Sequence, residues 1–177
     1  MLETGSPELK KLGIGGSINF IKENIINPEI NGVYCELPLI YKDPLNRFEL
    51  KGIADLVIIE NFDVIIVDYK TGSEIKKGSY FNQALKKRQT MQYPLNHIQD
   101  CNFWHYTLQL SFYAWMLQKI DPRLKIKQLI ILHIDHKNKE HLYECEYLKD
   151  TIDKLLTYHQ QKLNINSKYA KLKPIEY

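Results

Sequence analysis

Two aspartates and one lysine occur in two short segments whose spacing could bring them together. The segments read Gly-Ile-Ala-Asp-Leu-Val at 52–57 and Val-Asp-Tyr-Lys-Thr-Gly at 67–72. Asp55 lies among apolar residues and Asp68 ends an apolar run, where a lone charge is costly. Lys70 follows Asp68 by two positions, so both side chains leave the same face of an extended strand. The pattern predicts three ionisable groups on or beside a hydrophobic sheet.

Metal-assisted hydrolysis of a phosphodiester is the chemistry that suits these three residues. Two carboxylates that converge near a core repel each other unless a cation lies between them, and Mg2+ prefers such oxygen ligands. A bound divalent ion lowers the pKa of coordinated water and holds phosphate oxygens. Lys70 cannot be a ligand while protonated, but it can hold the attacking water and stabilise charge that grows on the phosphate. The alternative is a buried salt bridge between Asp68 and Lys70, with Asp55 as a hairpin residue.

Apolar patterns and turn residues predict the strands that position these groups. The run at 64–67 is apolar throughout, which is typical of a strand buried on both faces. Strand-forming runs upstream of it, separated by turn residues, predict an antiparallel meander. The expected strands are 33–41, 48–59 and 64–69, and the expected turns are 43–46 and 60–63.

The remaining segments complete a single α/β domain over 1–177, with a mixed central sheet in which returning strands join the meander and helices flank it. Leu108, Phe112 and Trp115 place an apolar stripe on the clearest helix, at 103–120. The other expected elements are a helix at 17–26, a polar loop with a short helix inside it at 71–101, strands at 126–134 and 141–147, a helix at 150–163, and loosely ordered ends at 1–16 and 168–177.

The composition is that of an ordinary soluble globular protein, with 177 residues, 44% hydrophobic and 25% charged. A net charge of +3 permits binding to a polyanion but is too small for a protein that coats nucleic acid. The three cysteines include no CxxC pair, which argues against a disulfide framework, a Cys-rich zinc site or an iron–sulfur cluster. No apolar run could span a bilayer and no signal peptide is evident, so we expect a cytoplasmic or nucleoid-associated protein, or one inside a virus-infected host cell, rather than a secreted one.

The two segments resemble motifs of a known nuclease superfamily. GIADLV and VDYKTG look like motifs II and III of the PD-(D/E)XK nuclease superfamily, and they are most similar to its RecB-like exonuclease branch. Gln109 and Tyr113 match the Q-x-x-x-Y feature of that branch and, being four residues apart, share one helix face. The three motifs occur in the family's order, within residues 33–120. The resemblance implies a restriction-endonuclease-like core.

The resemblance also implies a role for each site residue. Asp55 and Asp68 would bind Mg2+ or Mn2+, with Glu36 and the backbone carbonyl of Tyr69 as additional ligands. Lys70 would position the nucleophile, and the glutamine and tyrosine of the helix would orient Lys70 or the phosphate. The expected catalytic residues are Asp55, Asp68, Lys70, Glu36, Gln109 and Tyr113.

The chain departs from the branch in two features. Many RecB-like members carry a histidine on an N-terminal helix, whereas no histidine precedes His97 here. The metal stoichiometry and the processivity of that branch are therefore in doubt for this chain. The cluster cysteines of some relatives are also missing, so no iron–sulfur cluster is expected.

A basic segment directly follows the predicted catalytic strand. Its place beside Lys70 suits contact with phosphates, although a solvated loop is the simpler interpretation. Aromatic residues flank it and suit either stacking on unpaired bases or packing in the core, and the core is favoured for Trp104. The basic residues are Lys76, Lys77, Lys86, Lys87 and Arg88, and the aromatic residues are Tyr80, Phe81, Tyr93, Trp104 and Tyr106.

Two further polar groups lie on either side of the helix at 103–120. The first is expected to contact substrate or to shape the mouth of the site, and it consists of Asn96, His97, Asp100 and Asn102. The second invites a zinc interpretation, and it consists of His133, His136 and His141. No Cys or acidic residue at zinc spacing completes the histidines, so a solvated turn is expected there.

The pattern as a whole predicts a Mg2+- or Mn2+-dependent deoxyribonuclease. The favoured form is an exonuclease that acts on DNA ends or single strands in recombination, repair or viral DNA processing. One alternative is a structure-specific or restriction-type endonuclease on the same fold, and another is a nucleic-acid-binding module that has lost turnover. The expected partners are DNA, as single strands or duplex ends, and replication or recombination proteins, with no membrane association.

Overall fold

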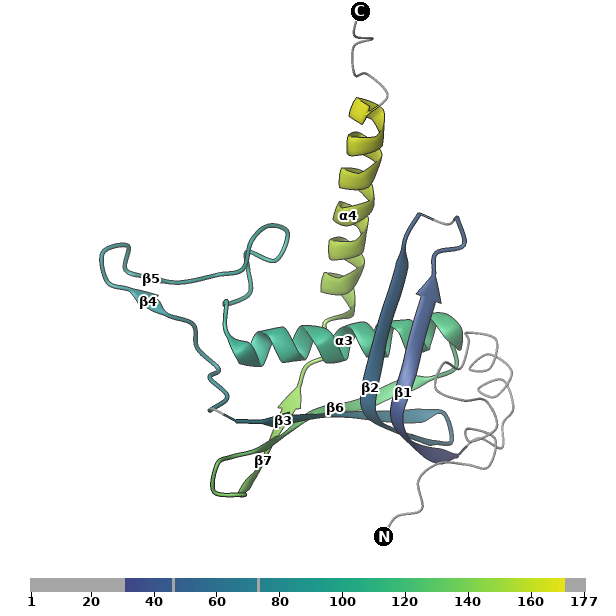
Figure 1. The fold of residues 1–177 in the computed structure, drawn as a ribbon, viewed down its shortest axis with the longest axis vertical. Coiled ribbons are helices and arrows are strands. Elements are labelled where there is room, and N and C mark those ends of the chain that lie inside the picture. The colour runs from purple at the N-terminus through teal and green to yellow at the C-terminus, as the bar shows by residue number, and fades with distance from the viewer. Residues whose placement is uncertain (1–30, 46, 73, 171–177) are drawn as a thin grey trace, which may run out of the picture.

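The computed structural model describes residues 31–45, 47–72 and 74–170, with side chains described as far as 163 (Figure 1). Its main sheet has five strands in the order β1-β2-β3-β6-β7. Only β3 and β6 pair in parallel, while the other neighbours are antiparallel. The expected meander and returning strands are therefore confirmed. The strands are β1 (Gly32–Lys42), β2 (Glu49–Glu60), β3 (Asp63–Thr71), β6 (Lys125–Ile134) and β7 (Glu140–Cys145).

Helix α3 (Asn102–Ile120) lies on one face of this sheet and contacts β1, β2, β3 and β6 (Figure 1). Leu110 and Leu117 of the helix and Ile131 of β6 are fully buried between them. The helix is buried on more than the one predicted stripe because α4 (Lys149–Ala170) packs against it. Ser111 Oγ accepts a 3.1 Å hydrogen bond from the Leu148 backbone N–H at this contact.

Strands β1 and β2 change the face that they bury at Glu36 and Asp55. Leu37 and Leu39 are buried, whereas Cys35, at the same parity of β1, is exposed. Glu36 has a positive φ of 49°, which lies in the left-handed region that non-glycine residues seldom adopt. The flanking pairs Cys35–Leu56 and Leu37–Ala54 place Glu36 opposite Asp55. The hairpin therefore bends at the residue that carries a predicted catalytic carboxylate.

The segment at 71–101 differs from its prediction, since its described residues contain no helix. It forms instead a short hairpin of β4 (Phe81–Asn82) and β5 (Lys87–Arg88). Buried apolar residues at intervals, such as Ile75, Met91 and Ile98, fix this segment to the body without a helical stripe. The expected short helix is wrong because the segment lacks apolar residues at helical spacing.

Other boundaries differ by smaller amounts. Helix α4 continues to Ala170, so the expected irregular tail at 168–177 is wrong for its first three residues. The expected helix at 17–26 and the expected loose start at 1–16 lie outside the described residues. Neither described helix combines the length and apolarity needed to cross a membrane.

Candidate active site

The candidate site lies at the point where strands β2 and β3 stop pairing. Their register runs from Glu60–Asp63 to Leu56–Val67 and ends one position before Asp55 and Asp68. The Asp55 carboxylate nevertheless lies close enough to Asp68 to raise the pKa of the Asp68 carboxyl, so the two carboxylates face each other at this opening. The Tyr69 backbone N–H donates a 2.8 Å hydrogen bond to Asp55 Oδ2 in place of a ladder bond. This contact fixes the Asp55 carboxylate at the opening.

Asp68 is 1% exposed, although it is an acidic residue. Its Oδ2 atom forms an ion pair with Lys70 Nζ at 2.6 Å, whereas Oδ1 has no charged partner, and neither oxygen has a hydrogen bond of good geometry among the described residues. Burial raises the pKa of Asp68, the Lys70 ammonium lowers it, and the neighbouring Asp55 carboxylate raises it again, with a net increase. A buried carboxylate with a second carboxylate beside it and a vacant lone pair is poorly satisfied by protein groups alone.

Side chains of helix α3 also contact the Lys70 ammonium. Gln109 Oε1 lies 3.4 Å from Lys70 Nζ, and the Tyr106 ring centroid lies 4.7 Å from it. Gln109 Nε2 donates a 2.8 Å hydrogen bond to Tyr113 Oη, which directs the Oε1 atom of the same amide toward Lys70. The structure thus joins Asp68, Lys70, Gln109 and Tyr113 into one connected chain of contacts.

Tyr106 is a member of the site that the sequence motifs did not assign. It precedes Gln109 by three positions, so the two side chains share one face of α3. That spacing was the available signal. The aromatic ring beside the ammonium holds the cation by its negative face and shields the ion pair from water.

The packing of Tyr113 explains why the segment at 52–57 begins with a glycine. A Cβ atom built at Gly52 would lie 2.6 Å from Tyr113 Cε1, which is closer than atoms of this kind can approach. The Tyr113 ring is only 8% exposed, so it has little room to move. Gly52 therefore leaves room on β2 for the Tyr113 ring in the position where Tyr113 Oη accepts the hydrogen bond from Gln109.

Replacing Gly52 with alanine is expected to destabilise the fold by about 1–3 kcal/mol, the usual cost of overpacking a core. It should also lower cleavage, because the displaced Tyr113 ring no longer orients Gln109. A urea unfolding curve and a cleavage assay measure the two effects. Ile53→Ala is the matched control, since Ile53 is the exposed neighbour on the same strand. Unchanged unfolding and cleavage in Gly52→Ala would show that the close approach is unnecessary.

A divalent cation fits the donor set at Asp55 and Asp68. The two carboxylates approach each other, and the unpartnered Asp68 Oδ1 is a buried acceptor without a donor. Among the described residues, however, no three His, Cys, Asp or Glu side chains lie close enough together to hold one ion. Glu36 faces outward at the strand bend and does not join the aspartates. Its role as a ligand stays a prediction from the resemblance, as does that of the Tyr69 carbonyl.

The predicted basic residues fall into two places. Lys76 and Lys77 lie at the start of the segment, and Lys77 Nζ lies 5.1 Å from the Phe103 ring centroid. The others, Lys86, Lys87 and Arg88, are exposed on the β4–β5 hairpin. No hydrogen bond or ion pair joins any of the five to the aspartates or to Lys70 within the part of the chain that the structure describes. Trp104 packs against the core at partial burial, as expected.

The predicted polar group before α3 serves mainly to hold the loop. Asn102 accepts a 2.8 Å hydrogen bond from the Lys76 backbone and donates a 3.1 Å bond to the Glu74 carbonyl. Asp100 accepts from Gln89 and pairs with His105. Asn96 and His97 are exposed, so contact with substrate stays a prediction for these two.

His133 corrects the expectation of a solvated turn at the three histidines. It is 3% exposed and lies within β6, stacked on His141 of β7 at a ring-centroid distance of 5.8 Å. Its Nε2 atom lies 3.3 Å from the Gly72 carbonyl oxygen. His133 lies on the face of β6 that also buries Leu129 and Ile131, which is why it is buried, whereas His136 lies in the exposed turn beyond.

Comparison with solved structures finds similar chains at low identity. SSO0001 is 18% identical with a TM-score of 0.41, and the alignment covers 82% of this chain and 58% of that one. A Eubacterium rectale protein, proposed to be an exonuclease, is 11% identical with a TM-score of 0.47, and the alignment covers 90% of this chain and 60% of that one. The chain thus spans about three fifths of the length of these structures. No curated protein matches it in sequence.

A sequence comparison with protein families identifies the chain more firmly. The PD-(D/E)XK nuclease superfamily matches residues 17–173, a range that contains both aspartates, Lys70 and the whole of α3. The mixed five-stranded sheet with its flanking helices agrees with a restriction-endonuclease-like core. The chain belongs to the PD-(D/E)XK nuclease superfamily.

Proposed function

We propose that this chain is a Mg2+- or Mn2+-dependent nuclease that hydrolyses DNA phosphodiester bonds. The observation that carries the proposal is the buried Asp68 carboxylate, which has Asp55 beside it, one unpartnered oxygen, and Lys70 Nζ at 2.6 Å from the other oxygen. A plain salt bridge needs neither the second carboxylate nor the free acceptor. A metal-assisted hydrolase needs both.

Asp55 and Asp68 would hold the cation, which when bound supplies a Lewis acid and water of lowered pKa. Asp68 is buried away from water, and charges interact more strongly in such an environment than in solvent. The Tyr69 N–H holds Asp55 in place before any ligand arrives. The chain therefore presents two oriented oxygen donors at one opening of the sheet.

Lys70 has the geometry to position the attacking water. An ammonium has three N–H donors, and here Gln109 Oε1 accepts a hydrogen bond from it while Asp68 Oδ2 forms an ion pair with it at 2.6 Å. The ammonium keeps an N–H for a water molecule or a phosphate oxygen, where it stabilises developing negative charge. Because Tyr113 fixes the orientation of the Gln109 amide, the ammonium is held without a mobile partner.

Digestion from DNA ends is the more specific part of the proposal, and it follows the RecB-like motifs. The test is incubation of the purified chain with end-labelled linear DNA and with covalently closed circular DNA, in Mg2+, Mn2+ or EDTA. We expect linear DNA to be degraded in either metal, circular DNA to be spared, and EDTA to stop the reaction.

The outcomes separate the proposal from its alternatives. Nicking of the circle would identify an endonuclease on the same fold. Binding of DNA without cleavage in any metal would identify a module that has lost turnover. Cleavage that persists in EDTA would contradict the metal-dependent mechanism at the two aspartates.

A further inference from the structure

We infer that the β4–β5 hairpin (residues 79–89) binds unpaired DNA beside the catalytic centre and thereby directs the enzyme to single-stranded ends and tails. This inference rests on the proposed function, because it names the substrate class of the same site. It draws on the charge, the exposed rings, the rigid base and the location of the hairpin.

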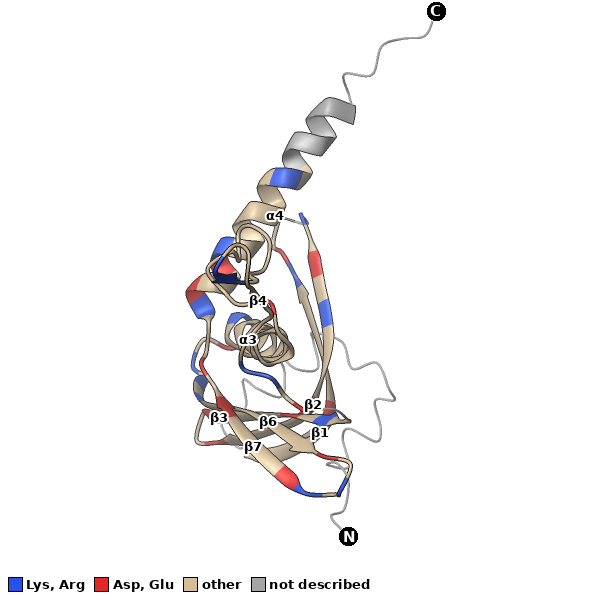
Figure 2. Cartoon of the chain, turned by 90° about the vertical axis from the view of Figure 1, so that its left-hand side faces the viewer, with Lys and Arg blue, Asp and Glu red and all other residues tan. Residues whose placement is uncertain are grey.

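Charge is concentrated in the segment that contains the hairpin. Between Ile75 and Gln99 the sequence has five Lys and Arg residues and no Asp or Glu, although the whole chain carries a net charge of only +3. The rest of the chain is therefore net negative. Lys86, Lys87 and Arg88 are exposed on the hairpin, and Figure 2 shows basic residues next to β4. A polyanion would be drawn to this segment before any other described surface of the chain.

Large apolar side chains are exposed on the same hairpin. The exposed fractions are 70% for Tyr80, 40% for Phe81 and 62% for Leu85. Exposed aromatic rings beside cations match the groups that hold single strands, since the rings stack on bases and the cations contact phosphates. The bases of a duplex are already stacked on each other, so these rings select unpaired nucleotides.

Hydrogen bonds make the base of the hairpin rigid. Ser79 Oγ donates a 2.6 Å bond to the Gln89 carbonyl, and the Gln89 N–H donates a 2.9 Å bond to the Tyr80 carbonyl. Arg88 Nη1 donates a 2.6 Å bond to the Ser79 carbonyl, and Ser79 is 5% exposed. The exposed rings therefore project from a fixed framework, which lowers the entropy lost when a strand binds.

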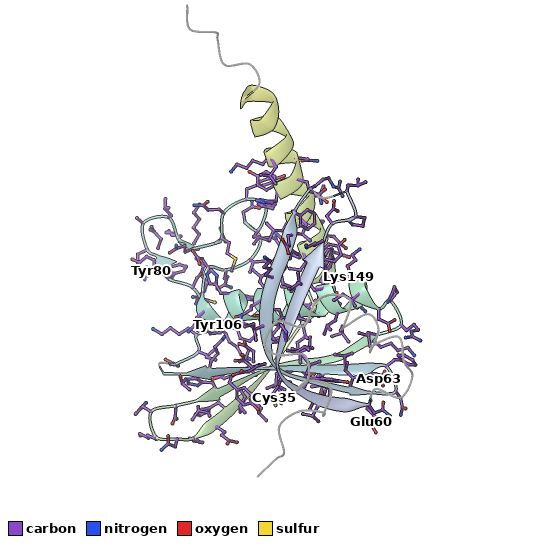
Figure 3. All side chains as sticks on the ribbon, turned by 45° about the vertical axis from the view of Figure 1, so that its right-hand side comes forward. Cys35, Glu60, Asp63, Tyr80, Tyr106 and Lys149 are labelled. Atoms are coloured by element: carbon purple, nitrogen blue, oxygen red, sulfur yellow. The ribbon has the colours of Figure 1, made fainter. Side chains whose placement is uncertain are left out.

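The hairpin segment is attached to the helix that carries the site. Asn102 holds the backbone at Lys76 and Glu74, and Asn102 begins α3. Tyr106 and Gln109, which contact Lys70, follow within two turns of the same helix. Figure 3 shows Tyr80 on the projecting segment and Tyr106 on α3. A strand bound on the hairpin can thus continue toward Lys70.

The test is fluorescence anisotropy of a labelled 15-nucleotide single strand and of the blunt duplex made from it, with the full chain in EDTA so that cleavage plays no part. Tyr80→Leu is expected to weaken binding of the single strand about tenfold, because the ring on which a base stacks is lost. Tyr80→Phe keeps the ring and should retain the affinity. Lys86→Gln combined with Lys87→Gln should reduce the slope of log affinity against log salt by about 1.4. Affinity for the blunt duplex should change less than affinity for the single strand in Tyr80→Leu.

Matched controls keep the outcome specific. Lys137→Gln combined with Lys139→Gln removes the same charge from the exposed β6–β7 turn and should leave the salt slope unchanged. Leu142→Ala removes an equally exposed apolar side chain (71%) and should leave binding unchanged. Equal binding by Tyr80→Leu and the unsubstituted chain would overturn the inference and leave the proposed function intact. Loss of single-strand binding in a chain that never cleaves DNA would support the inference while the proposed function fails.

Discussion

Replacing Asp68 with asparagine is expected to lower DNA cleavage by more than about a hundredfold, because even groups that only support metal ligands cost about 10–100-fold when they are removed. The same variant should raise the melting temperature of the metal-free chain. Burial raises the pKa of Asp68, so the folded chain keeps a proton that the unfolded chain releases at lower pH. Stability therefore falls as pH rises from the ordinary aspartate pKa through the raised one, and the penalty persists above it. Asparagine carries no charge and escapes this penalty.

Cleavage rates in Mg2+ and thermal melts in EDTA from pH 4 to 8 would measure both effects. Asp63→Asn is the matched control, because Asp63 lies on the same strand and pairs with Lys127 at 3.2 Å on the surface. It should change cleavage little, and its melting temperature should lack the rise expected for Asp68→Asn. An Asp68→Asn chain that still cut DNA at the original rate in Mg2+ would refute the assignment of this carboxylate.

Replacing Lys70 with methionine is expected to lower cleavage by about 100–1000-fold, the usual cost of removing a group that stabilises charge in the transition state. Methionine keeps much of the packing against Tyr106 but removes the ammonium. Binding of Mn2+ to this variant should be at least as tight as to the unsubstituted chain, since a positive charge near the carboxylates is gone. The Asp68→Asn variant should show the opposite, with weakened Mn2+ binding.

The contrast between the two variants separates catalysis from simple charge pairing. Titration of Mn2+ followed by electron paramagnetic resonance, together with cleavage rates, gives both quantities for each chain. Lys70→Arg should not restore the rate, because the planar guanidinium cannot reproduce the geometry of an ammonium. If Lys70→Met cut DNA nearly as fast as the unsubstituted chain, the pair with Asp68 would be a structural salt bridge.

Local sequence was enough to predict most of the elements around the site. The continuous apolar run at 64–67 marks β3, and the strand-forming runs upstream of it, separated by turn residues, mark β1 and β2. The spacing of Asp68 and Lys70 places both on one face, and the structure shows them in contact at 2.6 Å. The spacing of Gln109 and Tyr113 likewise predicted a shared helix face, and they are hydrogen-bonded at 2.8 Å.

The short helix expected within 71–101 shows where this approach failed. A polar stretch has no periodicity to interpret, so its conformation depends on partners elsewhere in the chain. Asn102 holds its start and Ser79 holds the hairpin base through hydrogen bonds that no local pattern encodes. The burial of His133 was missed for the same reason, since its ring contacts Gly72, which follows β3, and His141 of β7.

By itself the sequence determined which groups are candidates for the chemistry and which strands and helix carry them. The strand period of two residues and the helix period of 3.6 residues can be read from neighbouring positions. The tertiary structure alone decided that β1 and β2 change the face that they bury at Glu36 and Asp55, that Gly52 admits the Tyr113 ring, and that the Tyr106 ring lies beside Lys70. These are contacts between segments far apart in the chain. They depend on how closely the helix and the sheet pack, and no single segment specifies that distance.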